Sequence, residues 1–161
     1  MILSYNDIMA MGFRIGTDIK EATVELAIEA AEMYYISPSL GAGGYDVLAT
    51  LDTDSALVKG GTYTDDDGVK HHLAGLLKGI GYIAYAELLR MNISATTFGS
   101  VQKSDEYSEN VDPREQIRYF LAVGLQYVRQ VCALAGLVWR AQTGVGRETY
   151  FTRKEDRAWQ R

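Results

Sequence analysis

Three long stretches of the chain repeat apolar side chains at steps of three and four residues, and this spacing constrains the fold more than any other feature. The stretches run from about 18 to 35, from 69 to 91 and from 113 to 138. Such spacing lines apolar groups along one face of a helix. Because strands do not alternate with these helices, we predict a mainly α fold: a small helical bundle with long loops.

The first helix is expected to begin at a capping box and to end at a proline. Its apolar face is predicted to comprise Ile19, Ala22, Thr23, Leu26, Ala27, Ala30 and Met33. Asp18 and Glu21 have the spacing of a capping box, in which each side chain accepts a hydrogen bond from an amide at the helix start. We expect the helix to stop at Ser37-Pro38, because proline disfavours helical backbone in the residue before it.

The second helix contains Gly75, Gly79 and Gly81. Each glycine costs a helix roughly 1 kcal/mol relative to alanine. Their presence indicates either close approach by a neighbouring backbone, with Gly75 and Gly79 on one face, or simple core packing.

Two other helix starts are marked by caps. The third helix should begin with Asp112 as N-cap and Pro113 as its first residue. A short helix near residues 4–11 should be capped by Ser4 together with Asp7.

Two connections separate the helices. Residues 38–68 are rich in Gly, Asp and Thr, with a short helical turn expected near 54–59. Residues 93–111 favour an extended backbone. We predict that they form a β-like arm whose unpaired backbone groups bind another copy of the chain; the other interpretation is a solvated loop. The domain organisation is then a helical domain, 1–139, carrying this arm, and an extension, 140–161.

Side chains that could perform chemistry are few. His71 and His72 are expected to begin the second helix, where adjacent side chains point about 100° apart and cannot share a metal in the usual way. Cys132 should be a small buried hydrophobe on the third helix. We therefore predict no catalytic residue, no metal site and no cofactor, and a protein that is not an enzyme.

Two further patterns do not meet the requirements of the sites they suggest. The acidic clusters at 52–54 and 65–67 do not fit a calcium-loop template, and Asp67-Gly68 is better explained as a turn. The Gly79-Ile80-Gly81 pattern of a dinucleotide fingerprint falls in mid-helix, whereas the motif must follow a strand.

Charge is distributed unevenly. The chain has a net charge of −5, whereas residues 140–161 carry six basic and three acidic side chains, a net +3. Aromatic and basic side chains alternate there, so we expect this extension to dock on a partner subunit; nucleic-acid contact is the alternative. The candidate docking residues are Tyr150, Phe151, Arg153, Arg157 and Trp159.

The sequence also bears on where the chain is made. The sequence contains no run of 18 apolar residues, so we predict no membrane span. The first residues do not have the pattern of a signal peptide. One cysteine fits a reducing compartment. We expect synthesis in a cytoplasm.

The order of these parts resembles a known family. Residues 57–68 (LVKGGTYTDDDG), Ala74-Gly75-Leu76, the stretch 80–86 and the arm residues 97–103 (TFGSVQK) are similar to head–tail connector or ring proteins of crAss-like gut phages. The resemblance covers about residues 4–136.

This resemblance implies a dodecameric ring beneath the portal in the virion neck, made in the host bacterial cytoplasm. Its implied partners are other copies of the chain, the portal protein, further tail or neck rings, and DNA that passes through the lumen without specific binding. The candidate inter-subunit contacts are Tyr63, Phe98, Val101, Gln102 and Lys103. The alternatives are a small helical enzyme or ligand-binding protein with a site under residues 38–68, or a DNA-binding accessory protein using the basic C-terminus.

Overall fold

The computed structural model describes residues 1–16, 19–95 and 113–140. The predicted mainly helical fold is confirmed. In chain order the elements are α1 (Tyr5–Ala10), α2 (Glu21–Ala31), the π-helix η1 (Glu32–Ile36), α3 (Ser37–Ala49), α4 (Ala56–Lys59), β1 (Gly61–Thr64), β2 (Lys70–Leu73), α5 (Leu76–Ala95) and α6 (Pro113–Leu134).

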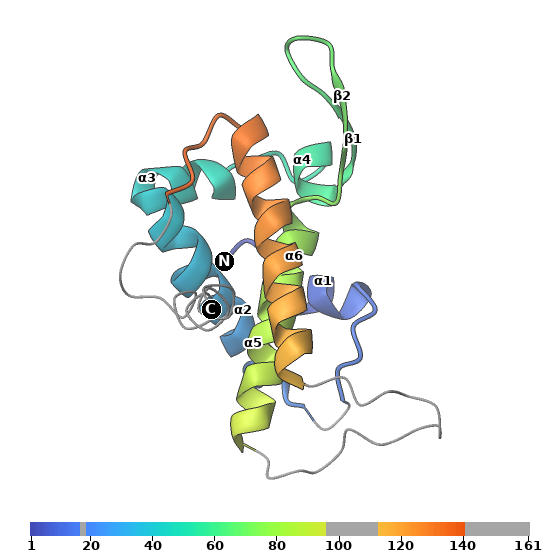
Figure 1. Ribbon diagram of the computed structural model, residues 1–161, viewed down its shortest axis with the longest axis vertical. Helices are drawn as coiled ribbons and strands as arrows, with labels where there is room; N and C mark the ends of the chain where they lie inside the picture. The colour runs from blue at the N-terminus through green and yellow to red at the C-terminus, as the bar shows by residue number, and fades with distance from the viewer. Residues whose placement is uncertain (17–18, 96–112, 141–161) are drawn as a thin grey trace, which may run out of the picture.

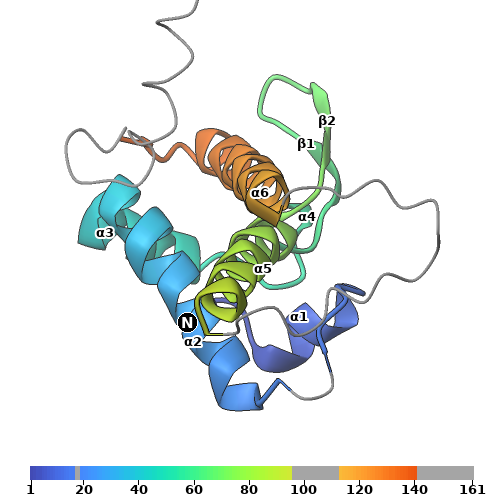
Figure 2. The same ribbon diagram turned by 60° about the horizontal axis from the view of Figure 1, so that its bottom comes forward.

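Helices α5 and α6 form the centre of the molecule and run antiparallel, side by side (Figures 1 and 2). Ile80 and Ile83 of α5 are fully buried, as is Val128 of α6. Helix α2 packs on α5 as well, and α1 closes part of the remaining surface. The core therefore lies around α5, with apolar side chains supplied from α2 and α6.

Close packing at a glycine, one of the two interpretations of the second helix, is confirmed at Gly79. A Cβ atom added there would lie 3.2 Å from the carbonyl oxygen of Gly124 on α6. Gly75 was wrongly placed in the helix: it joins β2 to α5 with φ +90°. Gly81 is helical and contacts Met11, where an added Cβ would lie 2.4 Å from the sulfur.

The expected end of the first helix at Ser37-Pro38 is wrong. The backbone continues from α2 through η1 into α3, where Pro38 occupies the first turn. Pro38 follows directly on the π-helical turn of η1, and proline is tolerated in the first turn of an α-helix. Residues 38–68 are therefore not one long loop but form α3, α4 and β1; the turn expected near 54–59 is confirmed as α4.

Other boundaries also differ from expectation. The N-cap of α2 is Lys20 rather than Asp18, which lies outside the described residues. Residues 93–95, assigned to the arm, are the last turn of α5, while the rest of the arm is not described. Helix α6 starts at Pro113 as predicted but ends at Leu134 rather than near 138. The cap of α1 is confirmed, with Ser4 and Asp7 forming a complete capping box.

Strands β1 and β2 form an antiparallel hairpin in which Thr62 pairs with His72 and Tyr63 with His71. The base of the hairpin packs on α4 and α6, and its tip extends beyond the end of the α5–α6 pair (Figures 1 and 2). His71 and His72 therefore lie in a strand, not at the start of a helix as predicted. The helical pattern applies only from Leu76 onward.

Candidate interaction surfaces

The tip of the hairpin is closed by the side chain of Asp65. Its Oδ1 accepts hydrogen bonds from the backbone amides of Asp67 at 3.1 Å and Val69 at 2.8 Å, and its Oδ2 lies 2.7 Å from Nε2 of His71. The bond to His71 and then the amide of Val69 lower the pKa of Asp65. Gly68 has φ +79°, which confirms the turn predicted at Asp67-Gly68.

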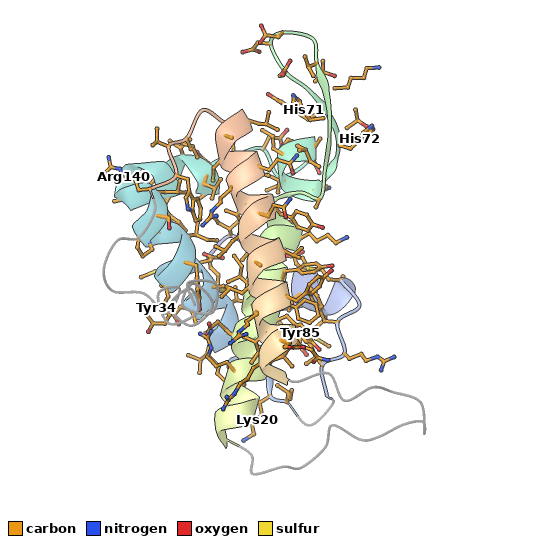
Figure 3. All side chains as sticks on the ribbon, in the orientation of Figure 1. Lys20, Tyr34, His71, His72, Tyr85 and Arg140 are labelled. Carbon is orange, nitrogen blue, oxygen red and sulfur yellow. The ribbon has the colours of Figure 1, made fainter. Side chains whose placement is uncertain are left out.

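The two histidines point to different sides of the hairpin, because neighbouring strand residues alternate between faces (Figure 3). His71 contacts Asp65, and Nδ1 of His72 lies 3.2 Å from the Thr62 hydroxyl. Within residues 1–16, 19–95 and 113–140, no three His, Cys, Asp or Glu side chains are grouped so that they could hold a metal ion.

A second surface lies along α2, where the predicted apolar face is confirmed only in part: Ala27 and Ala30 are buried, but two of its larger side chains are exposed. Leu26 is 57% exposed and Met33 55% exposed, whereas Val24 and Ile28 are fully buried. The helix carries apolar residues on two faces, and the packing of α5 selects the one containing Val24 and Ile28. An open groove of about 620 Å³ runs along the exposed face. Its lining includes Met1, Glu25, Leu26, Glu29, Met33 and Tyr45.

The floor of this groove is the carboxylate of Glu32 in η1, which is only 2% exposed. It accepts hydrogen bonds from the amides of Ile2 at 2.7 Å and Leu3 at 3.1 Å, and from the hydroxyl of Tyr45. Burial, followed by the contact with Glu32, raises the pKa of Tyr45, so the phenol stays protonated and donates. One buried carboxylate thus joins the N-terminus to η1 and α3.

The next turn of η1 supplies a second buried polar cluster. The hydroxyl of Tyr35 donates to Glu87 of α5 at 2.5 Å, and Arg90 donates to the Tyr35 hydroxyl at 2.9 Å. Burial and then the contact with Glu87 raise the pKa of Tyr35. Neither cluster was predicted from the sequence. The available signal was an acidic residue within an apolar helical period: Glu32 follows Val24 and Ile28 at steps of four.

The structure describes only one of the predicted inter-subunit contacts. Tyr63 lies in β1 and is half-buried against the core of its own chain. The other predicted contact and docking residues lie outside the described residues: Phe98, Val101, Gln102, Lys103, Tyr150, Phe151, Arg153, Arg157 and Trp159. Cys132 is fully buried as predicted, and burial raises the pKa of its thiol to about 11.

None of the helices in the described part of the chain is long and apolar enough to span a membrane.

The model of DUF6712, a family of unknown function, matches residues 36–120, more than half of the chain. The chain belongs to the DUF6712 family. The region shared with DUF6712 begins at the end of η1 and extends into α6, so it contains the hairpin, Glu87 and Gly79 but not α2. No curated protein and no solved structure matches this DUF6712 chain.

Proposed function

We propose that the chain is a structural subunit that repeats around a ring in the neck of a tailed bacteriophage, beneath the portal. Its activity is geometric: it holds a closed ring, continues the DNA channel and offers a platform for the next tail ring. The resemblance of residues 4–136 to connector proteins suggests this role. The observation that carries it is the hairpin projecting from a helical body (Figure 1).

The hairpin is suited to a contact between copies. In the described part of the chain its sheet has two strands, so each strand leaves one row of backbone N–H and C=O groups outside the pair. Such an edge is a template for binding another chain. A hairpin meeting the helical body of the next copy is a head-to-tail contact, and head-to-tail contacts generate rings when the rotation closes.

The base of the hairpin is closely packed, which fixes its direction relative to the body. Gly60 and Gly75 flank the two strands with φ +88° and φ +90°. A Cβ atom on Gly75 would lie 2.3 Å from the backbone nitrogen of Gly60. Only glycine fits both the positive φ and this separation. A projecting element held this way presents its edge in one orientation, which a regular ring requires.

The charge of the chain agrees with a passage for DNA. A net charge of −5 disfavours tight binding to the phosphate backbone, and each phosphate contact would add affinity and slow sliding.

The proposal is tested by coexpressing the full chain with the portal protein encoded by the same genome and examining the complexes by electron microscopy. We expect one ring of this chain on each portal. Portals that purify bare at every concentration tested would overturn the proposed function.

A matched pair of variants tests the hairpin itself. Val69, 53% exposed beside the tip, is changed to Asp, and Val47, 47% exposed on α3, is changed to Asp as the control. Both changes are on the surface and should leave folding intact. We expect V69D to abolish the ring and V47D to retain it. Equal assembly of the two variants would show that the hairpin is not part of the contact between copies.

The predicted arm is tested separately by deleting residues 96–103. We expect a helical monomer that no longer assembles on portals. Normal rings from this deletion would show that the arm is not an assembly element.

A further inference from the structure

The groove along α2 has the composition of a binding surface. Leu26, Met33 and Met1 are each more than half exposed around it, and the exposed carboxylates of Glu25 and Glu29 lie among them. An apolar patch bordered by polar groups marks a site of interaction. Ala22 and Leu26 lie one turn apart on the exposed face of α2, and Met33 is exposed beyond it in η1, with Glu29 between Leu26 and Met33.

The chain itself leads toward this surface. After α6, Leu137 donates its amide to the Cys132 carbonyl at 2.8 Å, and Arg129 lies over the Trp139 ring at 5.5 Å. Arg140 then donates its amide to the carbonyl of Ser39 in α3 at 2.8 Å. Figure 3 shows Arg140 on the same side of the α5–α6 pair as Tyr34, which follows Met33.

Residues 141–161 therefore depart from the first turn of α3, and Tyr45, which follows the kink at Gly41 in the same element, lines the groove. The remaining 21 residues can span up to about 70 Å when extended. Every position along α2 is within that reach.

The composition of the departing segment complements the groove. Residues 141–161 carry five basic and three acidic side chains, together with Tyr150, Phe151 and Trp159. Aromatic side chains can pack on the exposed apolar side chains of the groove, and Arg pairs with exposed carboxylates such as Glu25 and Glu29.

We propose that the groove along α2 binds residues 141–161 of the same chain. The intrachain arrangement is favoured because the segment starts at α3, the element that also contributes Tyr45 to the groove, and a short tether raises the effective local concentration to the millimolar range. The contact does not depend on the proposed ring, and either proposal can fail without the other.

Disulfide trapping in the full chain tests this contact. Leu26→Cys is combined with one cysteine in the tail: Thr149→Cys, Thr152→Cys or Ala158→Cys. The control places the first cysteine on the hairpin as Val69→Cys, with the same three tail positions. Cys132 stays in place because it is buried and its raised thiol pKa makes it unreactive near neutral pH.

We expect at least one tail cysteine to join Leu26→Cys within a single chain about tenfold faster than it joins Val69→Cys. Adding Glu25→Lys and Glu29→Lys should remove most of that advantage, because both changes reverse the charge facing the tail. Equal rates for the α2 and hairpin cysteines would overturn the proposal. Disulfide-linked dimers in place of intrachain bonds would overturn the assignment to the same chain and identify a second copy as the occupant.

Discussion

Gly79 of α5 and Gly124 of α6 face each other so closely that neither has room for a methyl group. A Cβ atom on Gly124 would lie 2.8 Å from the carbonyl oxygen of Gly79, and one on Gly79 would lie 3.2 Å from that of Gly124. This pair sets the separation of the two central helices, and every element packed on them depends on it.

Gly124→Ala should destabilise the protein. Alanine favours a helix by about 1 kcal/mol over glycine, but the added methyl group meets the backbone of α5, and overpacking costs about 1–3 kcal/mol. We expect the free energy of unfolding in urea to fall by up to about 2 kcal/mol, the overpacking cost less the gain in helix propensity. The control is Gly43→Ala in α3, where a methyl group meets open space among the described residues; its stability should be unchanged or slightly raised. A Gly124→Ala variant as stable as this control would contradict close packing of the pair.

Glu32→Ala should loosen the N-terminus. The change removes the acceptor for the amides of Ile2 and Leu3 and for the Tyr45 hydroxyl, and a buried donor without a partner costs about 1–3 kcal/mol. We expect a loss of about 2–3 kcal/mol in urea unfolding. The control is Glu29→Ala in α2. Glu29 is exposed, so this change should alter stability by less than about 0.5 kcal/mol. Equal effects of the two changes would show that the Glu32 contacts contribute little.

Alkali should reduce the stability contributed by Cys132. Burial raises its thiol pKa from the ordinary 9.0 to about 11, so between these values the thiol ionises in the unfolded chain but stays neutral in the folded one. The contribution of the neutral thiol is therefore fully present below pH 9 and is lost as the pH rises through 11. We expect the stability difference between the wild type and Cys132→Ala to shrink from pH 8 to pH 11. A difference that is constant with pH would contradict a buried, neutral thiol.

Asp65→Ala should fray the hairpin and leave the helices intact. The Asp65 side chain accepts the amides of Asp67 and Val69, and these amides should exchange with solvent faster once it is removed. Asp65→Asn keeps an oxygen at the same place and should retain most of the protection, as should Asp66→Ala. Hydrogen exchange followed by NMR measures this directly. Acid should act in the same direction as Asp65→Ala: the pKa of Asp65 is lowered, so its contribution is present above its ordinary pKa of 3.8 and is lost as pH falls through the lowered value.

Local signals in the sequence determined much of the helical architecture. The Ser4–Asp7 box, the start of α6 at Pro113 and the turn at Asp67-Gly68 each depend on a few neighbouring residues, so they could be predicted correctly. Periodicity likewise placed Cys132 in the core. Of the predicted contact residues, only Tyr63 lies in the described part of the chain, and the assembly role of all of them stays a prediction.

Tertiary structure alone decided which apolar face of α2 is buried. Leu26 and Ile28 are equally compatible with a helix, and only the position of α5 leaves Leu26 exposed. In the same way, Pro38 is compatible with the end of one helix or with the first turn of the next. His72 is a strand residue because it pairs with Thr62, ten residues earlier. The structural role of Glu32 likewise depends on tertiary contacts, because its carboxylate accepts hydrogen bonds from the amide of Ile2 and the hydroxyl of Tyr45. Periodicity and caps act within a turn or two of the chain, whereas burial and pairing depend on contacts between residues far apart in sequence.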